Sequence, residues 1–242
     1  MNANDNDGRR APLRCALLAC IAAVALGGCA TTASKDDPFE PMNRSLFEFH
    51  EAVDPVVVQP VIDLYTAVVP EFLRNAVANF FSNIDDMVSA ANDLLQGKFE
   101  KFNNDMGRVM LNTFVLGGIF DLATPLGIEK GNNDFGQTFG VWGFEQGPYL
   151  FVPFFGPTTF RDGAGWITRA FVGPVGFIPE VPVRNVLYGV GYVDLRDQAQ
   201  GAMKVAGTAA IDKYLFIRNA YLQRRRYLLY DGKPPPEPED DK

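Results

Sequence analysis

Few side chains in this sequence have the types and spacing that catalysis requires. The chain contains one histidine, His50, and four serines, of which Ser45 lies five residues before it. A serine nucleophile with a histidine base would be the chemistry of a hydrolase, yet no serine stands in a Gly-x-Ser-x-Gly turn. A packed or interfacial role is the simpler interpretation of His50. We therefore expect no catalytic residues.

The sequence also lacks the common motifs of metal and cofactor sites. The sequence has no Glu-x-x-His ligand pair, Walker loop or dinucleotide-binding fingerprint. Paired carboxylates occur at Asp36-Asp37 and Asp85-Asp86, but acidic neighbours on a tether or a helix are usually solvated. We expect no metal site and no cofactor.

The strongest chemical motif surrounds Cys29. Three arginines precede an apolar run over residues 15–26, which is the layout of an export signal. Leu26-Gly27-Gly28-Cys29 then matches the lipobox of bacterial lipoproteins, in which the cysteine becomes acylated after cleavage. Three acyl chains would anchor the chain effectively permanently, and the absence of an aspartate after Cys29 favours the outer membrane. An ordinary signal peptide with an incidental cysteine is the alternative.

The charge balance argues against a nucleic-acid partner. The formal net charge is -7, and binding of DNA or RNA usually needs a dense basic patch. The one tight basic cluster in the sequence is Arg224-Arg225-Arg226, which we expect to be a solvated last helical turn. Cys15 and Cys20 lie in the export signal, so the mature chain has no pair of thiols for a disulfide.

Hydrophobic periodicity predicts helices through most of the mature chain. We expect Pro55 to end the first helix, Gly97 the longest one, and Gly117-Gly118 the one after it. The expected helices cover residues 39–53, 56–68, 73–95, 99–114 and 194–230.

Residues 131–191 have a different character, because twelve glycines and six prolines are interleaved with aromatic residues. We expect short helical turns and extended loops here in place of long helices. Irregular backbone in contact with lipid would leave polar groups unpaired, so it must be buried in protein or line a cavity. The sequence therefore predicts an all-α domain with an irregular region that forms a pore or groove.

The chain divides into four segments by composition. We assign residues 1–28 to a lipoprotein signal peptide, 29–37 to a lipidated tether, 38–230 to one helical domain and 231–242 to an acidic, proline-rich tail. The tail has almost nothing to bury and is expected to be disordered.

Two motifs resemble the MlaA/VacJ family of outer-membrane lipoproteins. The family's opening Asp-Pro-x-Glu-x-x-Asn-Arg pattern is similar to Asp37-Pro38-Phe39-Glu40-Pro41-Met42-Asn43-Arg44. The family's central signature has counterparts, in order and spacing, in Phe135-Gly136-Gln137-Thr138-Phe139-Gly140, Gly147-Pro148-Tyr149-Leu150, Pro153, Gly156-Pro157 and Arg161-Asp162-Gly163. The resemblance covers residues 37–230.

The resemblance implies a ring-like helical domain, embedded in the inner leaflet of the outer membrane with a periplasmic-facing surface, and pierced by an amphipathic channel. It implies that the protein removes mislocalised phospholipid from the outer leaflet and passes it to a periplasmic carrier of the MlaC type, maintaining lipid asymmetry. A trimeric porin is a further implied partner. The residues that we expect along the lipid path are Asn43, Arg44, Phe47, Gly140, Gly143, Gly147, Pro148, Tyr149, Pro153 and Gly156.

For several of these residues a purely structural role is the alternative to contact with lipid. The glycines and prolines of residues 140–156 either let the backbone approach an acyl chain or only turn corners in a packed domain. Tyr149 would offer a hydroxyl at a wet edge. Arg44 meets either a headgroup phosphate or a surface salt bridge, and Arg161-Asp162 is better explained as a structural pair than as a ligand site.

Two other functions compete with phospholipid transport. A membrane-anchored scaffold that binds a porin without moving lipid predicts no continuous amphipathic passage through the domain. A lipid hydrolase predicts a serine within reach of His50.

Overall fold

The computed structural model describes residues 37–236, without the side chains of residues 115–116 and 202–209. The predicted signal peptide, Cys29, the tether up to residue 36 and the end of the tail lie outside the described residues. In chain order the elements are α2 (Glu40–Val57), α3 (Gln59–Val68), α4 (Glu71–Leu95), α5 (Phe99–Leu116), the 3-10 turn η1 (Thr124–Leu126), α6 (Phe135–Val141), β1 (Tyr149–Val152), β2 (Gly156–Thr159), α7 (Phe160–Val172), the 3-10 turn η2 (Pro174–Phe177), α8 (Val181–Ala209) and α9 (Lys213–Leu229).

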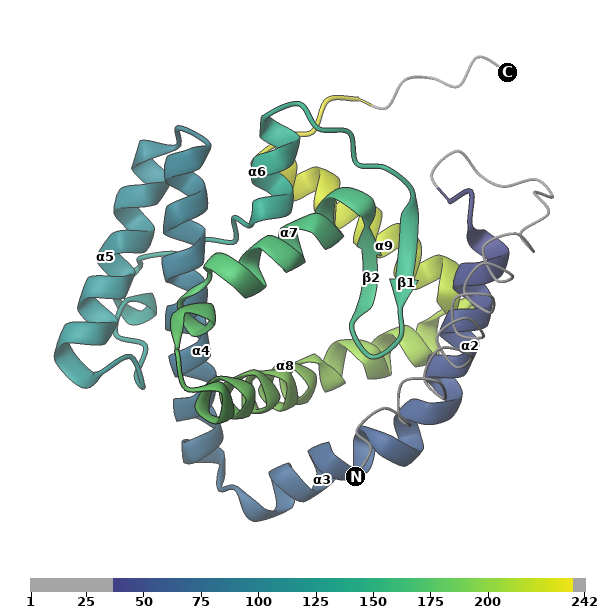
Figure 1. The fold of residues 1–242 in the computed structure, drawn as a ribbon, viewed down its shortest axis with the longest axis horizontal. Coiled ribbons are helices and arrows are strands. Elements are labelled where there is room, and N and C mark those ends of the chain that lie inside the picture. The colour runs from purple at the N-terminus through teal and green to yellow at the C-terminus, as the bar shows by residue number, and fades with distance from the viewer. Residues whose placement is uncertain (1–36, 237–242) are drawn as a thin grey trace, which may run out of the picture.

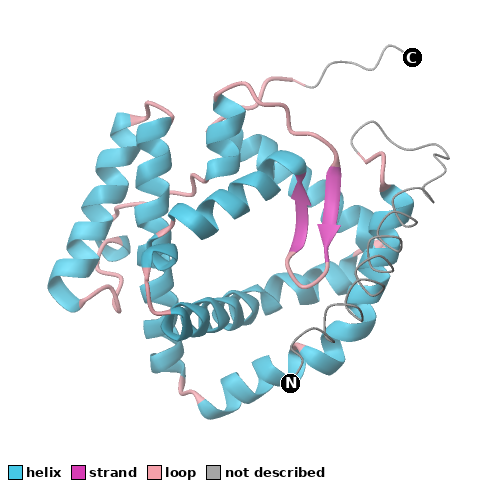
Figure 2. Cartoon of the chain, in the orientation of Figure 1, coloured by secondary structure: helices cyan, strands magenta, loops and turns pink. Residues whose placement is uncertain are grey.

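The helices are arranged as a ring (Figure 1). α2, α3 and α4 follow one another round its perimeter, and the elements from α6 to α7, with α9, close the other side. α8 crosses the ring between α7 and α3, while α5 packs on α4. The β1–β2 hairpin is the one departure from helix and loop that Figure 2 shows in the described part of the chain. The predicted fold, a single ring-like helical domain, is confirmed.

The long amphipathic helices form where the periodicity predicts them. α4 ends just before Gly97, whose φ is +72°, and α5 ends at Gly117 in the left-handed conformation. The prediction that Pro55 ends the first helix is wrong, because Pro55 lies inside α2. A proline removes one intrahelical hydrogen bond but leaves the residues after it free to stay helical. α2 therefore continues to Val57, and α3 begins two residues later.

The prediction that residues 131–191 hold no long helix is wrong in two places. α7 spans thirteen residues and begins at the side chain of Thr159, which accepts a first-turn N–H. α8 starts with Pro182 in its first turn, where a proline costs no hydrogen bond. Glycine is tolerated inside α7 because it permits close packing: a Cβ on Gly165 would lie 2.5 Å from the nitrogen of Gly136 in α6.

Polarity is inverted between the interior and the surface of this fold. In residues 37–236, twenty polar or charged residues are buried against eleven hydrophobic ones, and 37 large hydrophobic residues are exposed. Soluble domains seldom bury charged side chains without partners and seldom expose large contiguous apolar patches. The distribution indicates that ion pairs and hydrogen bonds hold the interior together, while many large hydrophobic side chains stay outside it.

Candidate functional site

An apolar groove lies between the β hairpin and α7. Its volume is about 470 Å³. α7 contributes one helical face, at i, i+3, i+4 and i+7 from Phe160. Two threonines are the only polar side chains among its lining residues, which in the described part of the chain are Leu150, Val152, Phe155, Thr158, Thr159, Phe160, Gly163, Ala164, Trp166 and Ile167. Such a lining fits hydrocarbon and offers nothing to a charged ligand.

Asn43 fastens the hairpin to α2. Its amide nitrogen donates to the Asp37 carboxylate at 2.8 Å and to the Tyr149 carbonyl at 3.1 Å, while its oxygen accepts the Phe151 N–H at 3.0 Å. Asn43 is fully buried, so water cannot replace these bonds. One amide on α2 therefore sets the position of the hairpin wall of the groove.

An aromatic core supports the same wall. Phe47, Tyr149, Phe151 and Tyr214 form one buried cluster with edge-on ring contacts. Tyr149 is fully buried, its hydroxyl has no hydrogen-bond partner in residues 37–236, and burial raises its pKa. The expectation that Tyr149 presents a hydroxyl at a wet edge is wrong, because its ring fills the space between α2 and α9. Phe47 and Tyr149 thus lie behind the groove.

Asp37 completes this core, although we expected it to be a solvated tether residue. It is fully buried and accepts hydrogen bonds from Asn43, from the Tyr214 hydroxyl and, at 3.2 Å, from Arg218. A buried carboxylate needs such partners to offset its lost hydration. The fold therefore includes Asp37, the first residue of the opening motif.

Arg44 lies apart from the groove. Its guanidinium donates to Glu40 at 2.8 Å and to Asp212 at 2.9 Å, and lies 4.6 Å from the centre of the Tyr214 ring. It lines a pocket of about 280 Å³ between α2 and the start of α9, which shares no residue with the groove. Of the two roles left open for Arg44, a headgroup contact or a salt bridge, the structure shows salt bridges, with Glu40 and Asp212.

None of the glycines and prolines that we expected along the lipid path, within residues 140–156, lines the groove. Gly147 and Gly156 have φ values of +69° and +90° near the two strands of the hairpin, and Pro153 lies in the turn between those strands. A Cβ on Gly147 would lie 3.0 Å from the Cβ of Phe160, a groove residue. The Pro148 carbonyl accepts the Phe160 N–H at 3.2 Å. These residues fix the angle between the hairpin and α7.

The two remaining glycines of this group lie further from the groove. A Cβ on Gly140 would lie 2.9 Å from a guanidinium nitrogen of Arg161, so Gly140 makes room for that buried arginine. Gly143 has a φ of +92° and open space around it. Arg161 itself lies 3.6 Å from Asp162, which agrees with a structural pair.

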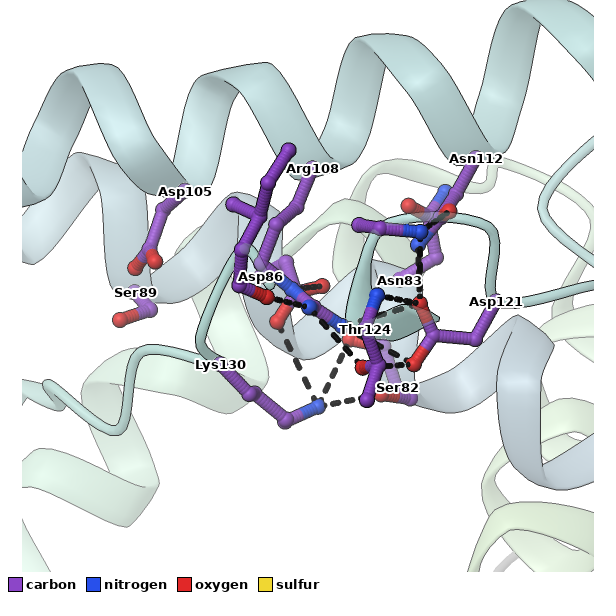
Figure 3. Close-up of polar contacts among 12 residues, drawn as sticks. Ser82, Asn83, Asp86, Ser89, Asp105, Arg108, Asn112, Asp121, Thr124 and Lys130 are labelled. Carbon is purple, nitrogen blue, oxygen red and sulfur yellow. Dashed lines mark hydrogen bonds and ion pairs between the residues drawn. The ribbon is translucent and has the colours of Figure 1, made fainter. Parts of the chain in front are cut away.

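A polar centre joins α4, α5 and the loop after α5 (Figure 3). Arg108, 1% exposed, donates to Asp86 at 3.0 Å, to Asp121 at 3.2 Å and to Thr124 at 3.2 Å. Burial acts to raise the pKa of Asp121, but hydrogen bonds from Thr124 and the charge of Arg108 lower it to about 2. Asp86 is fully buried, which corrects the expectation that the Asp85-Asp86 pair is solvated. Arg108 is the partner that makes this burial possible.

Lys130 approaches Ser82 in the same centre, a pair that could suggest nucleophilic chemistry. Its Nζ donates to the Ser82 hydroxyl at 2.5 Å and lies 3.4 Å from Asp86 (Figure 3). An ammonium group paired with a carboxylate is a hydrogen-bond donor and not a base. The arrangement ties the loop to α4.

Arg225 of α9 is a second buried arginine that binds carboxylates of other segments, here at the start of α6 and in α7. It donates to Asp134 at 2.5 and 2.9 Å and to Asp162 at 2.8 Å, and Tyr221 donates to Asp162 at 2.6 Å. The expectation of a solvated cluster at residues 224–226 is therefore wrong for Arg225, which is buried because two carboxylates on other helices need a counter-charge. The tail is also held at its first residue, since Lys98 and Lys101 both donate to Asp231.

Within residues 37–236, Ser45 and His50 do not form the hydrogen bond that a serine hydrolase would need. The histidine is buried, its Nδ1 has no hydrogen-bond partner in residues 37–236 and lies 3.8 Å from Asp54, and burial lowers its pKa. Ser45 donates to the Pro41 carbonyl instead. The described residues also contain no group of three or more His, Cys, Asp or Glu side chains that could hold a metal ion.

The sequence predicted a pore or groove within residues 131–191, but it missed the residues that line the groove. Its helical face consists of Phe160, Gly163, Ala164 and Ile167, and two small residues weaken the hydrophobic signal of that face. The spacing i, i+3, i+4, i+7 was the signal that could have found it.

An uncharged groove, a polar interior and apolar exposed helices define a helical protein that handles lipid. The chain belongs to the MlaA lipoprotein family, whose model matches residues 35–228.

Named relatives agree with this membership. The intermembrane phospholipid transport system lipoprotein MlaA of Haemophilus influenzae is 30% identical over 228 residues, which are 90% of this chain and 91% of the relative. The protein of the same name from Escherichia coli is 29% identical over 234 residues, with the same coverage. A solved structure from work on the maintenance of bacterial outer membrane lipid asymmetry superposes with a TM-score of 0.70 at 27% identity, covering 81% of this chain and all of that one.

Proposed function

We propose that this protein is an outer-membrane lipoprotein that removes mislocalised phospholipid from the outer leaflet and passes it through its ring to a periplasmic carrier, which maintains lipid asymmetry. The observation that carries the proposal is the uncharged groove of about 470 Å³ between the hairpin and α7, whose lining suits an acyl chain. The names of the relatives, lipoproteins of an intermembrane phospholipid transport system, support the choice of ligand.

The exposed surface supports an embedded position in one leaflet. On α3 and the end of α2, Val57, Val61, Leu64 and Val68 form an exposed stripe at i, i+4, i+7 and i+11. Such a stripe suits a helix lying in the plane of the membrane interface. By length and composition, none of the described helices could cross a membrane alone, whereas the stretch from α2 to α3 taken together with α4 could, with a bend of 118° between them.

The remaining components of the proposal come from the lipobox at Cys29 and from what the resemblance to the family implies. Acylation of Cys29 would hold the ring at the inner leaflet. The periplasmic-facing surface would meet a soluble carrier of the MlaC type, and a trimeric porin would be the membrane neighbour. The glycines and prolines of residues 140–156 would act indirectly, by setting the width of the groove between the hairpin and α7.

Two alanines of α7 offer a matched test. Ala164 lines the groove, and Ala170 is exposed on the same helix outside it. In a deletion strain complemented with each variant, we expect Ala164→Trp to raise outer-leaflet phospholipid and detergent sensitivity, because the indole fills the groove. Ala170→Trp should behave as the parent chain. Full function of Ala164→Trp at normal protein level would refute the proposal.

One observation favours the scaffold as a second candidate. α5 exposes Phe99, Met110 and Phe114, with Phe114 85% exposed, and none of them lines the groove. An apolar patch of this kind suits a protein neighbour in the membrane. A scaffold predicts that Phe114→Glu impairs function while Ala164→Trp does not.

A further inference from the structure

α7 turns the charged residues of its first turn away from the apolar groove. Arg161 and Asp162 are both buried. Asp162 accepts hydrogen bonds from Arg225 and Tyr221 of α9, at 2.8 and 2.6 Å. Arg161 lies against Gly140 of α6. The part of the groove lining that α7 contributes is therefore uncharged.

The two threonines of the lining are already hydrogen-bonded within the protein. The Thr159 hydroxyl accepts the Asp162 N–H at 3.3 Å, and the Thr158 hydroxyl donates to the Thr159 carbonyl at 3.3 Å. A phosphate or an amine in the groove would lose its hydration without gaining a partner among the described lining residues. A phospholipid can therefore place an acyl chain in the groove only with its headgroup outside.

The first described residues of the chain lie beside this groove. Asn43 joins the Asp37 carboxylate to the first residue of β1, at 2.8 and 3.1 Å, and the second residue of β1, Leu150, lines the groove. Phe39 is exposed, and its ring centre lies 6.5 Å from that of Phe160, another lining residue. The polypeptide therefore enters the fold at the edge of the groove.

The predicted acylation site can reach this edge. Residues 30–36 separate Cys29 from Asp37, so the two Cα atoms lie at most about 28 Å apart, at about 3.5 Å per residue. The α7 lining from Phe160 to Ile167 is about 10 Å long, at about 1.5 Å per residue. One of three acyl chains on Cys29 can leave the bilayer for the groove, because the other two still anchor the protein stably.

We propose that one acyl chain on Cys29 occupies the groove when no phospholipid is being carried, and that cargo has to displace it. This inference rests on the proposed transport function and adds an internal competitor for the same site. The resting occupant keeps water away from an apolar lining, whose hydration would be unfavourable. It also brings no charged headgroup, which suits a lining whose polar side chains are already bonded.

A photoreactive fatty acid tests this inference in the full chain. Cells that express the protein are grown with a fatty acid carrying a terminal diazirine, which enters phospholipid and lipoprotein acyl chains alike, and their membranes are irradiated. Trypsin releases the α7 lining after the first residue in the peptide of residues 162–169, and Cys29 in the peptide of residues 29–35. Mass spectrometry separates a link between these two peptides from a phospholipid adduct on peptide 162–169.

We expect the link between the two peptides in the parent chain. Ala164→Trp fills the groove and should abolish the link, whereas Ala170→Trp, the exposed control on the same helix, should keep it. Inserting twenty glycine and serine residues after Ser34 lengthens the tether from about 8 to about 28 residues. The link should then fall about sixfold, because effective concentration falls as roughly the −3/2 power of tether length. Phospholipid adducts on peptide 162–169 should rise in this variant, since its competitor is weaker.

The possible outcomes separate this inference from the proposed function. If peptide 162–169 carries phospholipid and no link to Cys29, the groove binds cargo but not the anchor, and this inference is wrong while the proposed function stands. If the peptide carries neither adduct, the groove binds no acyl chain and both fail. A link that persists in Ala164→Trp, a link that the insertion leaves unchanged, or a Cys29 peptide without acyl chains also overturns the inference.

Discussion

At the scale of single residues, two carboxyl groups share a buried space between α4 and α5. Asp93 and Asp105 are fully buried and lie within hydrogen-bonding reach of each other. Burial, and next the charge of Asp105, raise the pKa of Asp93 to about 7. Asn133, which precedes α6, donates to Asp93. The pair holds one proton until the pH approaches neutrality.

This pair predicts a loss of stability with rising pH. The folded protein binds the proton more tightly than the unfolded chain, in which aspartate titrates near 3.8. The free energy of unfolding therefore falls as pH rises from about 4 to about 7 and then levels off. Between pH 5 and pH 8 we expect the free energy of unfolding of the parent chain to fall by about 3 kcal/mol, at about 1.4 kcal/mol per pKa unit, and Asp93→Asn to abolish this decrease.

Denaturant unfolding of the full chain in detergent, at several pH values, measures this difference. The exposed Asp63 serves as the control, because Asp63→Asn should keep the slope of the parent chain. A parent and an Asp93→Asn variant with parallel pH profiles would show that the carboxyl groups do not share a proton.

Asn43 supports a second prediction at this scale. Asn43→Ala removes three buried hydrogen bonds and leaves the Phe151 N–H unpaired, so we expect a loss of about 2–4 kcal/mol in the free energy of unfolding. Ser45→Ala, on the same helix but exposed, should change it by less than about 0.5 kcal/mol. Thermal unfolding of both variants checks this, and equal midpoints would contradict the role of Asn43 as the link between α2 and the hairpin.

At the scale of elements, the local sequence was sufficient to predict a helix and its end where a hydrophobic stripe was followed by a glycine that ends the helix. α4 and α5 have both, and their predicted ends agree with the structure. α7 and the start of α8 contain glycines or prolines that lower local helix propensity, and tertiary packing overrides that cost. The hairpin could not be predicted from its own residues, because Asn43 holds it from more than a hundred positions away.

The crossing of α6 and α7 gives a prediction with an internal control. A Cβ on Gly165 would lie 2.5 Å from the backbone nitrogen of Gly136, whereas one on Gly163 would lie 3.8 Å from the nearest Thr158 atom. We expect Gly165→Ala to lower the free energy of unfolding by about 1–3 kcal/mol through overpacking. Gly163→Ala should be neutral or stabilise by up to about 1 kcal/mol, because alanine favours the helix. Equal effects of the two substitutions, in the same denaturant assay, would rule out close packing as the reason for glycine at position 165.

At the scale of the whole molecule, the ion pairs that hold the ring together join distant segments. Arg218 pairs with Asp37, Arg225 with Asp134, and Arg196 with Asp54, each across most of the chain or between separate helices. A single sequence shows that such charges exist but not which partner each one meets. The sequence also contains 20 phenylalanines, and several of those rings remain exposed outside the core.

The inverted polarity leads to a prediction about membrane binding. In a Cys29→Ala background, which removes the proposed acylation site, we expect Val61→Glu with Val68→Glu to lower binding to phospholipid vesicles at least tenfold. Each charge placed in hydrocarbon costs about 2–3 kcal/mol, less where it reaches the interface. Gln59→Glu with Thr66→Glu adds the same charge to the polar side of α3 and should lower binding by no more than about twofold, because those side chains stay in water. Vesicle flotation measures both double variants, and similar losses from the two would mean that α3 does not lie with its valine stripe in the membrane.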